Sequence, residues 1–452
     1  MINSTLGKAA ASMRGVLSGN DRRFSGISTD TRTLKEGELF FALDGASYNG
    51  SDFVDKAAFK HAAAAVVNKE TTSNIPQIIV NNTYKALGKL AKWWRNQMDV
   101  EIIAVTGSNG KTTLKEMISS CLFSVETLST EGNLNNHIGL PIMLLRLNRE
   151  HKIAVLEMGA NNPKEISYLT DLASPEIAVI NNAFPSHLEG FGSLEGVARA
   201  KGEILQGRVS PRQVILNADD QYFPLWKNMI KDVPVTSFGF SSNAIVRAVD
   251  IKTTSTESTF TLILPNSSIK IFLPLCGKHN VMNACAAAAV MFSLNMTSDN
   301  IKKGLENVSA ITGRLFTQKG NSNITIIDDS YNANPASVIA AVEFLSGING
   351  KKWLVLGDMA ELGEDSIKLH SQIGKNISNF GIDKLFAIGE MTKSTVSAFG
   401  KNGEWYESIE ALLMELNALK NQFPSVTLLI KGSRSMRMER VVEALTNNVN
   451  EK

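Results

Sequence analysis

One short segment, EIIAVTGSNGKTTLKEM at residues 101–117, constrains the fold of this chain more than any other. Its apolar, β-branched start predicts a buried strand ending at Thr106, and Gly107 and Gly110 predict a tight loop before a helix that opens at Lys111. Glycines in such a loop let backbone N–H groups surround phosphate oxygens, and the helix N-terminus adds a favourable dipole. The segment therefore predicts a nucleotide phosphate site at one edge of a parallel sheet.

Within this loop the residue types suggest separate roles. Lys111 is expected to reach the outer phosphates and the Thr112 hydroxyl to complete a Mg²⁺ shell. The pattern is the shorter TGxxGKT, because Val105 stands where the full GxxxxGK[ST] motif has glycine. The alternative, a plain strand-to-helix turn with a solvated lysine, is less favoured in this strand–loop–helix context. We expect cofactor contacts from Gly107, Ser108, Asn109, Gly110, Lys111, Thr112 and Thr113.

Length and composition set the broad class. The chain has 452 residues, with 46 Lys+Arg against 44 Asp+Glu and a formal charge of +2, which favours about three domains and excludes a globally basic protein that coats nucleic acid. Three cysteines without a CxxC pair argue against a disulfide framework and a structural zinc site. No apolar run approaches the roughly 18 residues of a membrane span, and the start lacks a secretory apolar region. We expect a cytoplasmic protein that neither binds nucleic acid nor inserts into a membrane.

The pattern along the chain predicts an α/β protein of three domains. These are a small α/β N-terminal domain at 1–83, a central P-loop domain with a parallel sheet at 84–312, and a C-terminal Rossmann-like α/β domain at 313–452. Short apolar runs such as IAVLE and QVILN suit parallel strands buried on both faces. After Pro234 the alternating runs FTLIL and IKIFL predict a small antiparallel insert. Helices are predicted at Asp52–Ala65, Tyr84–Gln97 and Val281–Phe292.

Other polar residues follow predicted strands. Glu157 ends IAVLE, where a carboxylate beside a phosphate loop could hold Mg²⁺ or could be a solvated strand end. His187 follows the next strand and Lys201 lies on the helix after it, but neither stands out on physical grounds alone. The polar run that includes Asn135 and Asn136 suits turn chemistry nearly as well as substrate contact. His279 and Asn283 share one helix face, and Arg314, Asp328, Asn332, Asn334, Lys431 and Arg434 lie near strand ends of the third domain.

The motifs TGSNGKTT, LEMGAN, SHLEGFGS, ARAKGEI, GKHNVMNA, DDSYNANP, LGDMAELG and KGSRSM occur in this order. Together they resemble the Mur ligases, ATP-dependent amide-forming enzymes of bacterial peptidoglycan synthesis. The early STDTR and LFFALDG and the late LGDMAELG are most similar to the branch of the family that adds D-alanyl-D-alanine. The DNPR-type motif of the diaminopimelate-adding branch is not found.

The resemblance implies roles for named residues. Lys111, His187 and Lys201 are implied as catalytic, Thr112 and Glu157 as Mg²⁺ ligands, His187 as a ligand of a second metal, and Lys201 as a carbamylated metal partner. His279 and Asn283 are implied near the adenine. The third-domain face that closes over the nucleotide is implied to contain Arg314, Asp328, Asn332 and Asn334. Substrate binding is expected from Ser28, Thr29, Asp30, Arg32, Asn49 and Gly50 at the UDP-sugar, and from Asn135, Asn136, Lys431 and Arg434.

The implied reaction joins D-alanyl-D-alanine to UDP-N-acetylmuramoyl-tripeptide through an acyl phosphate, with ATP and Mg²⁺ as cofactors. Because an acyl phosphate hydrolyses readily, we expect the third domain to close and exclude water, with Thr312–Arg314 as the hinge, and the chain to be a monomer. The alternatives are another Mur-type ligase, a folylpolyglutamate synthetase, a regulatory P-loop ATPase and a catalytically silent binding module. The chain lacks the NKxD guanine signature, and its retained Lys111 and Glu157 argue against a silent module.

Overall fold

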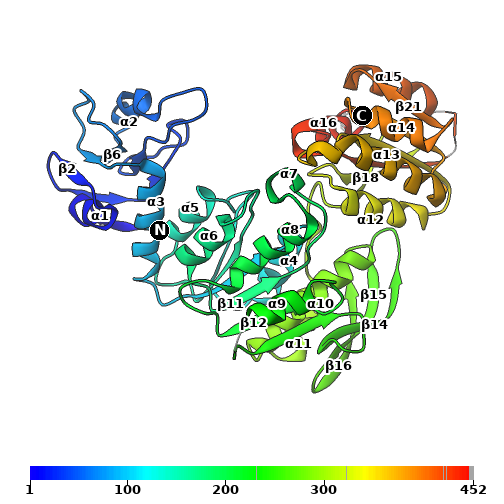
Figure 1. Cartoon of the computed structure of the whole chain (residues 1–452), viewed down its shortest axis with the longest axis horizontal. Helices are drawn as coiled ribbons and strands as arrows, with labels where there is room; N and C mark the ends of the chain where they lie inside the picture. Colours follow the sequence, from blue (N-terminus) through cyan, green and yellow to red (C-terminus); the bar gives the residue numbers. More distant parts are fainter. Residues whose placement is uncertain (231, 322, 421, 424, 447–452) are drawn as a thin grey trace.

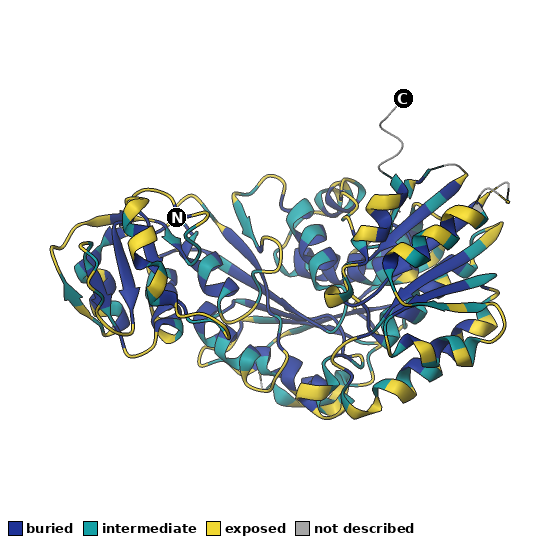
Figure 2. Ribbon diagram, turned by 90° about the horizontal axis from the view of Figure 1, so that it is seen from above, coloured by how far each residue is buried: buried dark blue, intermediate teal, exposed yellow. Residues whose placement is uncertain are grey.

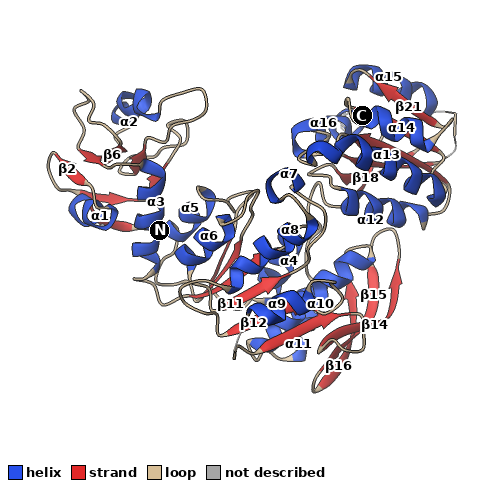
Figure 3. Ribbon diagram, in the orientation of Figure 1, coloured by secondary structure: helices blue, strands red, loops and turns tan. Residues whose placement is uncertain are grey.

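The computed structural model describes residues 1–452 except 231, 322, 421, 424 and 447–452. Three sheet-bearing parts follow one another along the molecule, with the N-terminal part at one end and the C-terminal part at the other (Figure 1). Helices cover both faces of the central and C-terminal sheets (Figure 3). The predicted three-part α/β fold is confirmed.

The N-terminal part contains a five-stranded sheet of order β2-β7-β6-β5-β4. Only β2 is antiparallel to its neighbour. The helix predicted at Asp52–Ala65 was too long, because His61 adopts a left-handed conformation (φ 57°) and β6 begins at Ala64. The elements are β1 (Asn3–Thr5), α1 (Leu6–Met13), β2 (Val16–Ser18), β3 (Arg23–Ser25), β4 (Ile27–Ser28), β5 (Leu39–Phe41), η1 (Gly50–Phe53), α2 (Val54–Phe59), β6 (Ala64–Val67) and β7 (Gln77–Ile79).

The central part contains a nine-stranded sheet of order β16-β15-β14-β13-β12-β11-β8-β10-β9. Its strands are β8 (Glu101–Thr106), β9 (Thr127–Ser129), β10 (Ile153–Glu157), β11 (Ile177–Ile180), β12 (Gln213–Asn217), β13 (Val235–Gly239), β14 (Val246–Thr253), β15 (Ser258–Leu264) and β16 (Ser267–Leu273). The predicted antiparallel strands exist, but β14 pairs in parallel with β13, so they extend the central sheet and do not form a separate insert.

Helices pack on both faces of this sheet. They are α3 (Thr83–Arg95), α4 (Lys111–Cys121), α5 (Gly139–Leu145), α6 (Glu165–Ala173), α7 (Leu188–Phe191), α8 (Leu194–Gly202), η2 (Glu203–Leu205), α9 (Phe223–Met229), α10 (Lys278–Ser293) and α11 (Ser298–Glu306). The continuous apolar run of β8 follows from this arrangement. Ile102 and Ala104 belong to the core on one face, whereas Ile103 and Val105 belong to the core on the other, as the two-residue period of a strand requires.

The C-terminal part contains a six-stranded sheet of order β17-β18-β22-β19-β20-β21, with β17 antiparallel to β18 and all other pairs parallel. Its strands are β17 (Phe316–Lys319), β18 (Ile324–Asp329), β19 (Lys351–Gly357), β20 (Lys384–Ile388), β21 (Gly403–Tyr406) and β22 (Val426–Lys431). Its helices are α12 (Pro335–Ser346), η3 (Gly363–Asp365), α13 (Ser366–Ile377), η4 (Ser378–Phe380), α14 (Thr392–Phe399), α15 (Ile409–Lys420), η5 (Arg434–Met436) and α16 (Glu439–Thr446).

The hydrophobic cores join the three parts unequally. One continuous core contains Ile2 and Phe41 of the N-terminal part together with Leu87 and Leu144 of the central part. Of the two cores at the C-terminal sheet, one takes in Cys276 of the central part and the other lies within the C-terminal part. Buried strands of the central and C-terminal sheets are visible in Figure 2. We infer that the first two parts form one body and that the third can move against it. The three sheets lie within 1–83, 84–312 and 313–452, and the limits themselves stay a prediction.

Candidate active site

A cavity of about 1280 Å³ lies between the central and C-terminal parts. The central part contributes the loops that follow β8, β10 and β11, which are neighbouring parallel strands. The C-terminal part contributes the residues that follow β18, β19 and β22. Carboxyl ends of two parallel sheets therefore face one space, the position where open α/β sheets bind ligands.

The phosphate loop is held in shape by asparagines. Gly110 has φ 79° and precedes α4; a Cβ there would lie 2.6 Å from Asn283 Oδ1 and 2.8 Å from Asn181 Nδ2, so only glycine fits. The Asn181 amide donates to Asn109 O (3.0 Å) and to Asn283 Oδ1 (2.8 Å), and Asn109 N donates to Asn182 Oδ1 (2.9 Å). The loop is thus fixed before any ligand arrives, with the first amides of α4 directed to the cavity edge.

Lys111 opens α4 and is half-buried. Its ammonium donates to Gly107 O (2.7 Å) within the same loop. The pKa of Lys111 is lowered to about 8, chiefly by burial; Glu157 opposes the shift, and the charge of Arg314 contributes to it. Burial destabilises the charged form of this lysine because it removes solvent from the ammonium. A bound phosphate would stabilise the charged form again, because it brings an opposite charge close to the ammonium.

Glu157 and Thr112 form the oxygen pair that the sequence predicts. Thr112 Oγ1 donates to Glu157 Oε2 (3.3 Å), and Asn135 Nδ2 donates to the same oxygen (3.4 Å). The other carboxylate oxygen, Oε1, is buried without a hydrogen-bond partner in the described part of the chain. An orphaned buried carboxylate oxygen beside a phosphate loop fits a hard divalent cation.

No cluster of three or more His, Cys, Asp or Glu side chains that could hold a metal occurs among the described residues. The protein would therefore give Mg²⁺ few ligands, Thr112 and Glu157, and leave the remaining positions to phosphates and water, as Mg²⁺ sites commonly do. The metal roles predicted for all four residues stay predictions.

The contacts of His187 and Lys201 are with groups other than Thr112 and Glu157. His187 lines the cavity, but its Nδ1 contacts Glu361 Oε2 of the C-terminal part. This contact and burial act in opposite directions on the pKa of Glu361, and the imidazole dominates and lowers it. Lys201 is 1% exposed, and its Nζ lies 5.4 Å from the centroid of the Phe191 ring. Burial, and then repulsion from Lys111, lowers the pKa of Lys201 to about 7.

The residues predicted to lie near the adenine line the same cavity. His279 is half-buried, and burial lowers its pKa. Asn283 is buried and already bonded to Asn181. Both line the cavity, as does Asn280, which donates to Cys276 O (2.8 Å) and thereby fixes the start of α10.

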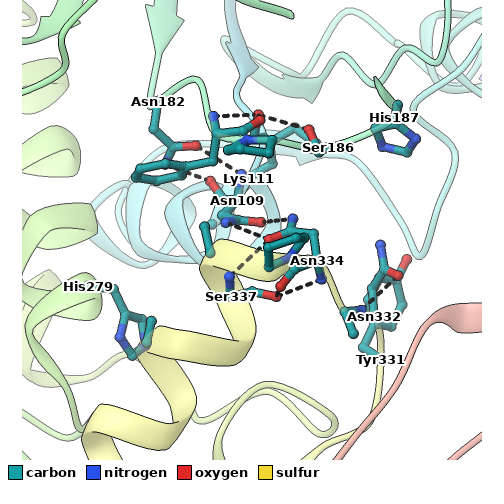
Figure 4. Close-up of a pocket in the computed structure, with 18 of the residues that line it drawn as sticks. Asn109, Lys111, Asn182, Ser186, His187, His279, Tyr331, Asn332, Asn334 and Ser337 are labelled. Carbon is teal, nitrogen blue, oxygen red and sulfur yellow. Dashed lines mark hydrogen bonds between the residues drawn. The ribbon is translucent and has the colours of Figure 1, made fainter. Parts of the chain in front are cut away.

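Asn334 connects the C-terminal part directly to the phosphate loop (Figure 4). Its Nδ2 donates to Asn109 Oδ1 (2.7 Å), while its Oδ1 accepts from Ser337 N (2.9 Å) and from Asn109 Nδ2 (3.4 Å). One side chain therefore caps α12 and contacts the loop. Arg314 lies over the Tyr331 ring, 4.1 Å from its centroid, and Asn332 also lines the cavity.

Several candidates have structural partners in place. Asp328 is not among the described residues that line the cavity; it accepts from Gly313 N (3.1 Å) and Ser330 N (3.1 Å) and so anchors the interdomain connection. Lys431 instead pairs with the neighbouring acid, Asp329, at 2.5 Å. Arg434 bonds Glu439 at 3.1 Å.

The remaining predicted substrate residues lie in two places. Asn135 lines the cavity, and Asn136 does so while its Oδ1 accepts from Gly139 N (2.9 Å) at the start of α5. The N-terminal candidates lie outside the described lining of this cavity and form turns of their own, where Asp30 pairs with Arg32 and Asn49 caps η1. They are Ser28, Thr29, Asp30, Arg32, Asn49 and Gly50.

Sequence reasoning missed several residues that shape the cavity. Asn181 and Asn182 directly follow the β11 run IAVI, so the same strand-end rule that selected Glu157 could have found them. Asp329 and Tyr331 lie inside the motif DDSYNANP but were passed over for their neighbours. Glu361 lies inside the motif LGDMAELG, but its role was not predicted because its partner His187 is distant in sequence.

Comparison with known proteins identifies the class that this fold and site define. The Mur ligase family catalytic domain matches residues 23–95, the Mur ligase middle domain 105–291, and the Mur ligase glutamate ligase domain 313–434. The chain belongs to the Mur ligase family, and the resemblance predicted from its motifs is confirmed.

Within the family, several relatives carry the same name. The UDP-N-acetylmuramoyl-tripeptide–D-alanyl-D-alanine ligase of Escherichia coli (strain K12) is 43% identical, with 99% of both chains covered. That of Bacillus subtilis (strain 168) is 35% identical over 98% of this chain and 99% of the relative. A crystal structure of MurF from Acinetobacter baumannii superposes with a TM-score of 0.93 at 34% identity, covering 98% and 99% of the two chains. A folylpolyglutamate synthase of Mycobacterium tuberculosis, at 15% identity and a TM-score of 0.65, shares the fold alone.

Proposed function

We propose that this chain is an ATP-dependent ligase that adds D-alanyl-D-alanine to UDP-N-acetylmuramoyl-tripeptide in peptidoglycan precursor synthesis. The observation that carries the proposal is the similarity to ligases of that name along the entire chain, including the N-terminal and C-terminal parts that would hold the two non-nucleotide substrates. We further propose that the chain acts as a monomer in the cytoplasm. In the described residues no helix is both long and apolar enough to cross a bilayer.

The reaction has two steps. A carboxylate oxygen at the end of the tripeptide attacks the γ-phosphorus of ATP, the bond to the β-phosphate oxygen breaks, and ADP leaves. The amine nitrogen of D-alanyl-D-alanine then attacks the acyl carbon, loses a proton, and expels inorganic phosphate. The first step brings two anions together, so its transition state needs positive charge held in advance.

The cavity supplies that charge with few groups. Lys111 releases Gly107 O and turns to the phosphate, while the first N–H groups of α4, which follow the loop held by Asn181 and Asn182, bind phosphate oxygens. Mg²⁺, when bound at Thr112 and Glu157, neutralises part of the phosphate charge. Arg314, held on Tyr331, approaches from the C-terminal part. Asn334 joins the two parts over the loop, and closure of the C-terminal part over the cavity would exclude water from the acyl phosphate.

The electrostatic surroundings of Lys201 favour carbamylation of its amine. A lysine must be neutral to react with CO₂, and burial together with Lys111 brings its pKa to about 7. Carbamylation would replace an ammonium repelled by Lys111 with an anion attracted to it. We therefore propose that Lys201 is carbamylated in the active protein, and that a sample incubated with ¹³C-bicarbonate gives a carbamate signal that Lys201→Met lacks.

The ligation itself is the deciding test. Protein, ATP and Mg²⁺ incubated with UDP-N-acetylmuramoyl-tripeptide and D-alanyl-D-alanine should yield one UDP-muramoyl pentapeptide per ADP. Single amino acids or folate in place of these substrates should yield none. ADP formed without any pentapeptide would overturn the proposal in favour of a regulatory ATPase, and product with single amino acids would favour another branch of the family.

Domain closure gives a separate expectation. Gly313 (φ 78°) and Leu315 (φ 50°) lie where the chain passes from the central part to the C-terminal part, and their amides donate to Asp328 and Asp329. We propose that rotation at Thr312–Arg314 closes the cavity. An ATP analogue with tripeptide should lower the radius of gyration measured by solution scattering. Identical scattering curves with and without these ligands would count against the hinge.

A further inference from the structure

We propose that Glu361 is a positioning residue that fixes the imidazole of His187 across the interface between the central and C-terminal parts. The inference rests on the proposed function, because it assigns Glu361 a task in the ligation site. It differs from the motif-based expectation, which gave no role to Glu361 and treated His187 as a residue of the central domain alone.

The contact is electrostatic. His187 Nδ1 lies in ion-pair contact with Glu361 Oε2, and this buried nitrogen has no hydrogen-bond partner in the described part of the chain, so the nearby carboxylate is the charge that acts on it. The backbone adds a second link, since Glu189 N donates to Glu361 O (3.4 Å). Both residues of the pair are non-glycine residues in the left-handed region, His187 at φ 51° and Glu361 at φ 61°. Such conformations are sparsely populated and gather at functional sites.

The Glu361 loop is held firmly by the C-terminal part. Just before it, Met359 N donates to Nε2 of His370 (3.0 Å), a fully buried histidine whose Nδ1 faces Ser366 O (2.8 Å). Asp358 accepts from Thr392 N (2.9 Å) through its side chain and from Ser433 N (3.0 Å) through its carbonyl. Because the loop cannot swing freely, the carboxylate reaches His187 only when the two parts lie as they do here.

The pairing determines which imidazole nitrogen is available. A carboxylate at Nδ1 favours the tautomer with the proton on Nδ1, and Nε2 then remains an acceptor. Without Glu361, the neutral ring is free to place its proton on Nε2 and to rotate. The C-terminal part would thus complete the His187 site at the moment when it covers the acyl phosphate. A plain interface ion pair would hold the parts together without selecting a tautomer.

The test reads the tautomer directly. The chain has six histidines, so ¹⁵N-histidine labelling gives a short set of imidazole signals, and the loss of one set in His187→Gln assigns it. At about pH 8.5, where ordinary imidazoles are neutral, we expect the Nδ1–H form in the wild type and in Glu361→Gln, whose amide oxygen still accepts. Glu361→Ala should shift the ring toward the Nε2–H form. Glu364→Gln, an exposed acid of the same segment, should change nothing.

Kinetics then separate positioning from interface stability. Glu361→Ala should lower kcat by about 10- to 100-fold, the usual effect of removing a carboxylate behind a functional histidine, with KM for ATP changed by less than about threefold and partial recovery in Glu361→Gln. An unchanged tautomer in Glu361→Ala would overturn the proposal, as would a changed tautomer with kcat equal to that of Glu364→Gln. If the wild type forms no pentapeptide, the proposed function fails, but the tautomer measurement still decides whether Glu361 orients His187.

Discussion

Lys111→Met is expected to lower kcat/KM for ATP by about three orders of magnitude, the scale seen when one placed donor to a developing charge is removed. Lys111 is the cation at the start of α4. It donates to Gly107 O, but the loop around it is also held by Asn181, Asn182 and Asn283, whose contacts the substitution leaves in place. The variant should therefore keep the wild-type circular dichroism and urea midpoint. Activity close to wild type would remove Lys111 from the phosphate site.

The same residue gives a pH dependence with a definite sign. In the free protein the pKa of Lys111 is lowered to about 8, so its cationic form is complete below that pH and disappears as pH rises through 8. Since the cation binds phosphate, the association constant for ATP should be level below about pH 7 and fall up to tenfold per pH unit above 8. Calorimetric titration with ATP alone measures this without interference from the amine substrate.

A charge-keeping variant provides the control. Lys111→Arg stays protonated across this range, so its ATP affinity, although weakened by the larger head group, should not fall between pH 8 and 9.5. If the ATP affinity of the wild type did not change between pH 8 and 9.5, Lys111 would not be the group that controls the pH dependence of ATP binding.

The sequence was informative wherever chemistry depends on neighbours in the chain. The strand, glycines and helix start at residues 101–117 lie as predicted, because a phosphate loop is a local structure whose φ > 0 position and helix terminus are encoded within it. Parallel strand ends likewise predicted that Glu157 and Asn334 would each lie at a ligand-binding edge of a sheet, whereas the family resemblance alone implied that the two edges meet; both residues line one cavity. The antiparallel strands after β13 were foreseen, but their attachment to the central sheet was not, since strand pairing is decided by partners far along the chain.

Pairing across the chain also explains what was missed at the site. Asp328 and Asp329 have the same residue type and adjacent positions, yet one anchors Gly313 and the other pairs with Lys431. Alternation along β18 sends them to opposite sides of the strand, and only the fold shows which side faces the cavity. Glu361 and Tyr331 matter through partners that no local pattern connects to them.

Lys201→Met is expected to abolish most ligation and to stabilise the protein. Lys201 is 1% exposed, and no carboxylate among the described residues forms an ion pair with its ammonium. Its pKa is lowered from 10.5 to about 7, first by burial and then by Lys111. Each pKa unit corresponds to about 1.4 kcal/mol, so the buried lysine destabilises the folded state by about 3 kcal/mol at pH 8 and by about 5 kcal/mol below pH 7.

The sign of this pH dependence follows from proton counts. Between pH 7 and 10.5 the unfolded chain carries a proton on Lys201 that the folded chain lacks, so the free energy of unfolding of the wild type should rise with pH across this window relative to Lys201→Met. Urea unfolding in bicarbonate-free buffer at pH 6, 8 and 10 measures the difference, which should be largest at pH 6 and nearly absent at pH 10. Lys152→Met, at an exposed lysine, should match the wild type at all three.

Carbamylation would explain why a lysine that destabilises the folded state occupies this position. Added bicarbonate should stabilise the wild type and leave Lys201→Met unchanged, because only an amine can form the carbamate that removes the buried ammonium and pairs with Lys111. The two proteins should therefore converge in stability as bicarbonate rises, while only the wild type ligates. Equal urea midpoints at pH 6 without bicarbonate would contradict the buried-charge argument, and the position of Lys201 against Phe191 would then have to be explained by packing alone.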